Sequence, residues 1–396
     1  MIVALVLRFE VVVIISRLIA KNWRNFRTLD VSFRERQFVV GPNAAGKSNL
    51  LDVFRFLRDI AKPEGGGLQK ALKDRGGVSK VRSLSARRDP VISLEIHLSE
   101  SPDAEPEWRY SVGIRQQTRA LRLPFVSYER VWHRERQILD RPNDDDSSDP
   151  ARLTQTYLEQ IGANAGFRDV ARFLQSITYL HLVPQLLRFA DQIQGRIIED
   201  DPFGQSFLER VAKTPEKTRN ARFKTIEDAV KIAVPQLQQL QFTRDEATGR
   251  PHLRALYSHW RMNAGWQQED QFSDGTLRLI GLLWSLLEGD SLLLLEEPEL
   301  SLNAGIVAQL APLIYRFQKA RRRQILVSTH SEALLTEEGI DAREVLLLTP
   351  ASEGTAVVVA SDVDEIRALL EAGFTVGEAV LPRTRPTEAS RLTSVG

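Results

Sequence analysis

The stretch "GPNAAGKS", residues 41–48, decides the fold that we expect for this chain. It follows the apolar run "RQFVV" (36–40) and leads into "NLLDVFRFLRDI" (49–60), whose apolar residues recur at helical spacing. The stretch matches the pattern G-x-x-x-x-G-K-[ST] in full. Glycines let backbone N–H groups turn toward phosphate oxygens, and the N-terminus of the following helix adds favourable partial charge. The stretch therefore predicts a nucleotide-phosphate site between a strand and a helix.

Two side chains of this loop carry specific chemistry in that interpretation. Lys47 reaches the β- and γ-phosphates of ATP, and the Ser48 hydroxyl is a ligand of Mg²⁺. A plain strand-to-helix turn is the alternative, so further stretches are needed to decide. The predicted nucleotide-binding residues of the loop are Gly41, Asn43, Ala45, Gly46, Lys47, Ser48 and Asn49.

A second stretch, "LLLLEE" (292–297), is an apolar strand that ends in paired carboxylates. Two adjacent acids at the end of a buried strand are costly unless a cation or a water molecule meets them. We expect Glu296 to hold Mg²⁺, directly or through water, and Glu297 to orient and deprotonate the attacking water. A strand that simply runs out into solvent is the alternative, and it is less attractive because Pro298 and a third acid, Glu299, follow.

Two more stretches suit a nucleotide site. "LVSTH" (326–330) is another buried strand, and its final residue, His330, is predicted to sense the γ-phosphate rather than to be a structural histidine. "FSDGTLRL" (272–279) places three small or acidic residues before a helix, which alone indicates an N-capped helix. Because this stretch precedes the carboxylate strand, a plain N-capped helix becomes a less favoured interpretation of Ser273, Asp274 and Gly275.

Composition excludes several classes of protein. The chain has 396 residues, which predicts about two to three domains. It has no cysteine, which excludes disulfides and thiolate sites and fits a cytoplasmic protein. The net charge of +1 gives no global indication of nucleic-acid binding. The apolar start, "MIVALVLRFEVVVII" (1–15), contains Arg8 and Glu10 and is shorter than the ~20 residues of a membrane span, so no membrane segment is expected.

The order of the predicted elements gives an α/β fold with a split head. Three strands precede the loop at 41–48, further strands follow up to residue 140, residues 151–240 have mainly helical spacing, and α/β patterning resumes after residue 262. The predicted parts are an N-terminal extension (1–13), the first part of the head (14–140), a mainly helical insertion (141–261), the second part of the head (262–381) and a flexible tail (382–396). The extension is either a loosely attached strand or the product of an upstream start codon assigned in error.

These motifs, in this order, resemble those of the ABC-type ATPases of the RecF, SMC and Rad50 group. The resemblance is closest to the OLD-like AAA_21 ATPases of bacterial defence operons. "GPNAAGKSN" is similar to the Walker A loop and "LLLLEEPE" to the Walker B segment. "SDGT" stands at the signature sequence, "ELSLN" is similar to the D-loop and "STH" contains the switch histidine. "AKNWRNF" (20–26) resembles the opening strand, whose arginine, Arg24 here, lies near the nucleotide in the family.

The resemblance covers roughly residues 14–140 and 262–380 and predicts an ABC-type P-loop NTPase head, with a mixed sheet and an antiparallel β lobe. Two features depart from the family. Glu296 stands where many ABC proteins have Asp, and the usual Leu-His-Pro is Leu302-Asn303-Ala304, so a D-loop histidine contact does not carry over. The Q-loop glutamine has two candidates, Gln116 and Gln117.

The resemblance also implies a mechanism. ATP and Mg²⁺ on Lys47 and Ser48 of one head would meet Ser273, Asp274 and Gly275 of another, which makes the protein at least a homodimer. Only 66 residues follow His330, so the Toprim nuclease domain of full OLD proteins is expected to be absent. We therefore expect an ATP-hydrolysing sensor or regulator in anti-phage defence, with a separately encoded effector such as a nuclease or toxin.

Two other functions remain open at this point. One is a RecF-like DNA-repair ATPase, and the other is an ATP-bound scaffold that hydrolyses negligibly. DNA binding would use two groups of basic residues, although such groups are more often solvated faces. The groups are Arg109, Arg115, Arg119, Arg122, Arg130, Arg134 and Arg136 in the β lobe, and Arg321, Arg322 and Arg323.

Overall fold

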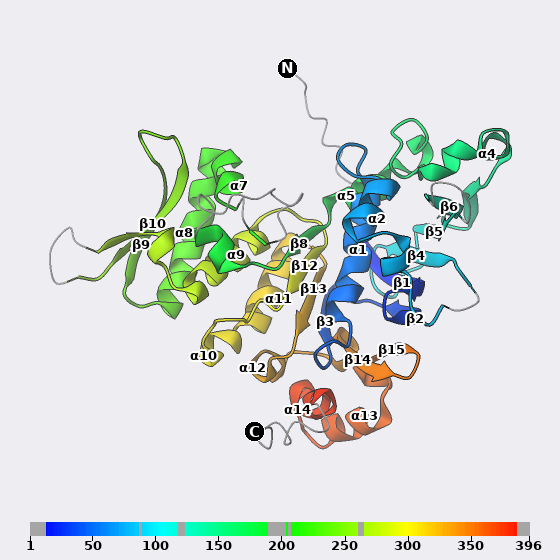
Figure 1. The fold of residues 1–396 in the computed structure, drawn as a ribbon. Helices are drawn as coiled ribbons and strands as arrows, with labels where there is room; N and C mark the ends of the chain where they lie inside the picture. Colours follow the sequence, from blue (N-terminus) through cyan, green and yellow to red (C-terminus); the bar gives the residue numbers. More distant parts are fainter. Residues whose placement is uncertain are drawn as a thin grey trace, which may run out of the picture.

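The computed structural model describes residues 13–86, 89–117, 123–188, 203–204, 207–259 and 265–385 of the chain. These residues form two six-stranded sheets and one three-stranded sheet, with helices between and around them (Figure 1). The predicted N-terminal extension, apart from Val13, and the tail beyond residue 385 lie outside the described residues. Within the described ranges, no helix is both long and apolar enough to cross a bilayer.

The central sheet carries the loop at 41–48 at the end of one of its middle strands. In spatial order its strands are β15 (Gly354–Val359), β14 (Val345–Ala351), β3 (Arg36–Val40), β13 (Ile325–Thr329), β12 (Leu293–Glu296) and β8 (Thr178–Leu180). Neighbouring strands are parallel except for β15, which is antiparallel to β14. All residues of β3 and β13 are buried. The continuous apolar runs are thus explained by a sheet that is covered on both faces.

The two faces of the central sheet pack into two different hydrophobic cores. Val39, Leu294 and Leu326 lie in the core that contains helices α1 (Lys47–Ala61) and α5 (Arg168–Ser176). Phe38, Leu295 and Val327 lie in the core of helices α9 (Asp274–Leu287) and α11 (Leu310–Arg321). Because side chains alternate along a strand, each strand contributes to both cores and holds the motif-bearing loops at its end.

The antiparallel β lobe packs on the far side of α1. Its strands, in spatial order, are β2 (Phe26–Ser32), β1 (Ile14–Trp23), β4 (Ile92–Ser99), β5 (Trp108–Gln116), β6 (Pro124–His133) and β7 (Arg136–Arg141). Residues from β1, β4, β5 and β6 share the core of α1. Helices α2 (Leu68–Asp74) and α3 (Val78–Val81) connect α1 to this lobe. The predicted α/β head with an antiparallel lobe is confirmed.

The boundary that we predicted at residue 141 differs from the structure. Helix α5 packs on α1, and strand β8 pairs in parallel with β12 in the central sheet. The Arg141 side chain is fully buried and pairs with Asp146, in the acidic segment "NDDDSSDP" (143–150). Residues 141–182 therefore belong to the head, because their apolar and charged side chains complete its core.

The remaining part of the predicted insertion is a mixed unit beside α9. It contains helices and a small sheet in the order β11-β10-β9, so it extends through β11 past residue 261, the predicted end of the insertion. Its apolar side chains join the core of α9, where Phe207 and Phe223 both contact the Trp284 ring. The elements are α6 (Pro184–Arg188), α7 (Phe207–Lys213), α8 (Glu216–Ala233), β9 (Leu237–Arg244), β10 (Pro251–Tyr257) and β11 (Trp266–Gln268).

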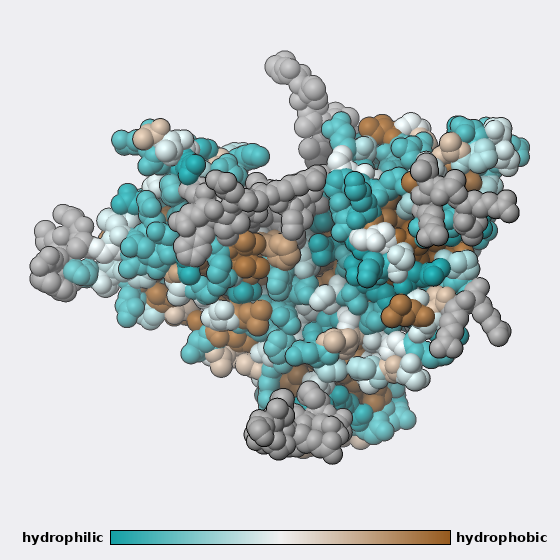
Figure 2. Space-filling model, viewed as in Figure 1, coloured by the Kyte–Doolittle hydropathy of each residue, from teal (hydrophilic) through white to brown (hydrophobic). Residues whose placement is uncertain are grey.

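Four short helices in the second half of the chain contact one another: α12 (Glu332–Leu335) contacts α10 (Ala304–Val307) and α14 (Val376–Val380), and α14 contacts α13 (Asp364–Glu371). Another short helix, α4 (Asp144–Ser148), follows the β lobe. On the face drawn in Figure 2, hydrophilic residues predominate and apolar residues form small separate patches.

Candidate functional site

The loop at 41–48 has the backbone shape that its glycines predict. Gly46 has φ of 98° and Ala44 has φ of 63°, both in the left-handed region. A Cβ atom on Gly46 would lie 2.1 Å from the Asn25 side-chain nitrogen, and one on Gly41 would lie 2.7 Å from the Leu348 carbonyl oxygen. A side chain at either position would clash with these atoms, so both positions require glycine. The loop leads directly into helix α1. Asn43 is exposed at the tip of the loop, whereas Ala45 is buried.

Lys47 lies under this loop and not in solvent. Its Nζ donates hydrogen bonds to the carbonyl oxygens of Gly41 (2.9 Å) and Pro42 (3.2 Å). Burial lowers the pKa of Lys47, whereas the charges of Glu297, Glu296 and Glu299 raise it. The ammonium group is therefore held inside the loop, close to the acids at the end of β12, where phosphate oxygens could replace the carbonyls as its partners.

Ser48 and Glu296 meet across the gap between the loop and β12, although they are 248 positions apart. The Ser48 hydroxyl donates to Glu296 Oε1, and the Tyr179 hydroxyl donates to Glu296 Oε2. His181 Nδ1 lies 3.3 Å from the Glu296 backbone oxygen. A hydroxyl and a carboxylate oxygen are the kind of ligands that Mg²⁺ prefers, so this pair fits the predicted metal site.

Sequence reasoning did not identify Tyr179. Burial, followed by the charge of Glu296, raises the pKa of its hydroxyl, so the group stays protonated and donates. The Arg55 guanidinium covers its ring at 4.2 Å. Tyr179 lies on β8, a strand of three residues that is too short to show a periodic pattern, and it belongs to no motif.

Glu297 and His330 lie together at the carboxyl ends of two neighbouring strands. His330 Nδ1 is 3.2 Å from Glu297 Oε1, and the Glu297 N–H donates to the Ser328 carbonyl oxygen (3.0 Å). Glu297 has φ of 45°, an unusual value for a residue with a side chain, so the chain turns sharply directly after β12. Lys47, Ser48, Glu296, Glu297 and His330 are thus brought to the same edge of the sheet.

Arg24 and its neighbour Asn25 have different positions in the site. The Arg24 guanidinium donates to the Asp52 carboxylate (2.6 Å), which also binds Arg75, so the structure pairs Arg24 with helix α1. Asn25, which we did not predict, donates to the Ala45 carbonyl oxygen (2.9 Å) and accepts from the Asn49 side chain (2.7 Å). Asn25 therefore supports the backbone of the phosphate loop directly.

The predicted signature residues interact with their own surroundings. Ser273 accepts from the Thr276 N–H (3.1 Å) and caps α9, and Asp274 pairs with Arg188 (2.6 Å). A Cβ atom on Gly275 would lie 2.6 Å from the Ser301 carbonyl oxygen, so the start of α9 packs against the D-loop. Among the described residues, these three have no hydrogen bond or ion pair with the loop at 41–48.

The basic groups have mixed surroundings. In the β lobe, Arg109 lies over Trp132 at 4.9 Å and Arg130 pairs with Asp140; Arg119 and Arg122 lie outside the described residues. In the group at 321–323, Arg321 and Arg322 are exposed, whereas Arg323 is not available to a DNA phosphate. Arg323 is buried and donates to the carbonyl oxygens of Ser285, Glu288 and Ser291, because it closes the end of α9.

The two candidate Q-loop glutamines, Gln116 and Gln117, lie where β5 ends and the chain turns toward β6. Both side chains are exposed at this turn of the β lobe.

Comparisons with known proteins agree with this geometry. A family model described as "AAA domain, putative AbiEii toxin, Type IV TA system" matches residues 38–336. A comparison with curated proteins gives no match.

Among solved structures, the chain is similar to an Smc head bound to the C-terminal winged-helix domain of ScpA. The TM-score is 0.52 at 14% identity, over 87% of this chain and 97% of that chain. It is also similar to an Smc head with an extended coiled coil, bound to the C-terminal domain of ScpA, from Pyrococcus furiosus. Here the TM-score is 0.50 at 12% identity, over 91% of this chain and 100% of that chain. At these identities the similarity shows the fold, which is that of an ABC-type ATPase head.

Proposed function

Because the chain belongs to the AAA_21 family of ABC-type P-loop ATPases, we propose that it hydrolyses ATP with Mg²⁺ and that two heads close around the nucleotide. The observation that carries this proposal is the meeting of Ser48 with Glu296 beside Lys47, Glu297 and His330. These residues come from three separate segments of the chain. Their roles follow from their chemistry and their neighbours.

Binding begins with the loop at 41–48 and the N-terminus of α1. Lys47 exchanges its carbonyl partners for phosphate oxygens of ATP, a change that raises its lowered pKa because a negative charge replaces neutral dipoles. Ser48 and Glu296 would hold the metal, and the Tyr179 hydroxyl, which donates to the second oxygen of the carboxylate, would keep Glu296 in position. Mg²⁺, when bound, neutralises charge on the phosphate oxygens.

Hydrolysis uses the acid that follows the metal ligand. Glu297 accepts a proton from the water that attacks the γ-phosphate. His330 Nδ1 lies 3.2 Å from Glu297 Oε1. In the histidine tautomer with a proton on Nδ1, the ring donates to Glu297 and keeps this carboxylate oriented. The same ring can contact the γ-phosphate through its other nitrogen, which would make it the sensor of that group.

Two heads are needed in this proposal because, among the described residues, the signature residues make no hydrogen bond or ion pair with the loop at 41–48 of their own chain. Ser273, Asp274 and Gly275 would face the nucleotide of a second head, so that ATP links the two heads and its hydrolysis releases them. The light-scattering mass in ATP and Mg²⁺ should be twice the mass without nucleotide. Phosphate release should require Mg²⁺ and should be lost in Lys47→Ala but not in Lys224→Ala, an exposed lysine on α8. A monomer mass both with and without ATP and Mg²⁺ would contradict the closure of two heads around the nucleotide.

We further propose that the heads act as a sensor or regulator of a separately encoded effector in anti-phage defence. The family description, which includes a toxin of a toxin–antitoxin system, supports this context. The two Smc heads to which the chain is similar are each bound to a domain of another protein, ScpA, which supports a partner on the head. Purification of the protein from its native operon should recover the effector, and repeated isolation of the ATPase alone would count against it.

Two alternatives have separate tests. In a RecF-like DNA-binding ATPase, the arginines of the β lobe would contact phosphates, and the affinity for duplex DNA would fall steeply with salt. In a non-hydrolysing scaffold, ATP would support dimer formation without phosphate release. The Ser48–Glu296 pair occurs in either case, whereas the Glu297–His330 pair favours hydrolysis.

A further inference from the structure

Helix α9, which begins at the signature residues, carries a buried arginine without a partner. The Arg278 side chain is only 7% exposed, and its Nε has no hydrogen-bond partner. Across the described ranges, Arg278 forms neither a hydrogen bond nor an ion pair. A buried cation in this state is costly, and such a group needs an explanation.

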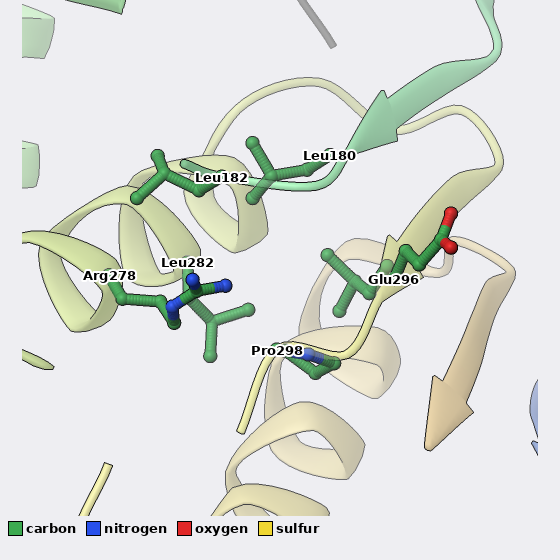
Figure 3. A pocket seen from close by; sticks show the side chains of 7 residues that line it. Leu180, Leu182, Arg278, Leu282, Glu296 and Pro298 are labelled. Carbon is green, nitrogen blue, oxygen red and sulfur yellow. The ribbon is translucent and has the colours of Figure 1, made fainter. Parts of the chain in front are cut away.

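Arg278 points into a small pocket behind the Walker B strand (Figure 3). The pocket has room for roughly one water molecule, and its walls are mainly apolar. Figure 3 shows the Glu296 carboxylate turned away from Arg278. Its two oxygens accept hydrogen bonds from Ser48 and Tyr179 instead. Glu296 is therefore not the partner of this arginine.

The complementary group is Glu299, in the same turn as the catalytic acid. Glu299 Oε1 accepts from the Thr329 hydroxyl (2.5 Å) and the His330 N–H (3.4 Å). Its second oxygen, Oε2, is buried without a hydrogen-bond partner. Arg278 lines the small pocket together with Pro298, the residue directly before Glu299, so the two unpartnered groups belong to elements that pack against each other. Burial lowers the pKa of Arg278, and the charges of Asp274, Glu299 and Glu297 oppose that change. Asp274 already binds Arg188 and Gln185.

We propose that Arg278 is a positioning residue whose guanidinium pairs with the free oxygen of Glu299 when two heads close on ATP. The inference rests on the proposed function, because closure supplies the force that shifts α9 against the Walker B turn. Glu299 already holds Thr329 and His330, so the new pair would fix the histidine that orients Glu297. A shift of the signature helix α9 would thus change the positions of the hydrolytic residues Glu297 and His330 in the same head.

A double-mutant cycle tests this pair with Arg278→Met, Glu299→Gln and the double variant. Each single change should lower kcat for phosphate release about tenfold, and the double variant should lower it no further, because both remove one interaction. KM for ATP should stay within about twofold, since neither residue contacts the phosphate loop. Without nucleotide, Arg278→Met should melt no lower than wild type, because it removes an unpaired buried charge.

Matched variants make the result specific. Arg278→Lys keeps the charge and should restore part of kcat. Arg222→Met changes an arginine of α8 whose Nε is also unpartnered and whose guanidinium lies over the Trp284 ring of α9, and it should leave kcat unchanged. If Arg278→Met does not fold, the cycle is run with Arg278→Lys.

Three outcomes would overturn the inference. Losses that multiply in the double variant would show that the residues act independently. A lower melting temperature with unchanged kcat would show a purely structural arginine. If wild type neither dimerises nor hydrolyses with ATP, the proposed function fails, and this inference fails with it; the first two outcomes leave that function intact.

Discussion

The phosphate-loop side and the signature side of the head differ in how complete they are. On the first side, residues from distant segments already bind one another: Ser48 binds Glu296, and Glu297 lies beside His330. On the second side, Ser273 caps its own helix and Asp274 binds Arg188. The difference fits the proposed two-head site, in which one chain would assemble the phosphate and metal half and would present the other half to a second head. Variants on each side can test that division.

The largest effects should come from removing one side at a time and mixing the products. Lys47→Ala and Ser273→Arg should each lose hydrolysis by a factor on the order of 10² or more, since each destroys both sites of a symmetric dimer. A one-to-one mixture should recover roughly a quarter of wild-type activity, because half of the dimers carry one site with both sides intact. Phosphate release measures this recovery, and an inactive mixture that still forms mixed dimers would refute the division.

Glu297→Gln should separate binding from chemistry on the phosphate-loop side. The amide cannot accept the proton of the attacking water, so kcat should fall by about 10²–10⁴-fold. ATP should still close the heads, and the dimer should persist after wild type has reopened. Light scattering over time records this, with Glu332→Gln, in the short helix α12, as the control. Rapid hydrolysis by Glu297→Gln would mean that another group activates the water.

Tyr179→Phe should affect the metal rather than the nucleotide. The ring can remain under Arg55, while Glu296 loses a donor, so the Mg²⁺ concentration for half-maximal hydrolysis should rise about tenfold or more. KM for ATP at saturating Mg²⁺ should hardly change. Tyr315→Phe, a partly exposed tyrosine on α11, is the matched control. A change confined to ATP affinity would contradict the contact with Glu296.

Arg24→Gln should have the smallest effect. Because the guanidinium binds Asp52 and the phosphate loop is held by Asn25, KM for ATP should change by less than about threefold. Asn25→Ala should raise KM more than Arg24→Gln, and ATP titrations compare the two. A larger effect of Arg24→Gln would show that this arginine leaves Asp52 for the nucleotide, as the family resemblance predicts.

The parts of this site that could be predicted from the sequence are those with local order. The loop at 41–48 and the acids after "LLLL" each lie within a few residues of the strand that positions them. Tyr179 and Asn25 could not be found in this way, because their roles depend on contacts 117 and 20 positions away. The boundary at residue 141 was wrong for a similar reason, since β8 is defined by its partner strand and not by its own pattern.

The hairpin β14–β15 reaches the phosphate loop from the other end of the chain. The Thr355 hydroxyl donates to the Ala45 carbonyl oxygen (2.8 Å) and accepts from Asn25 (2.6 Å). The loop is therefore preorganised, and much of the conformational entropy lost on binding a ligand is already lost on folding. A fragment that stops after His330 would retain every recognisable motif and still bind nucleotide weakly, because the hydrogen bond from Thr355 to the Ala45 carbonyl oxygen would be missing.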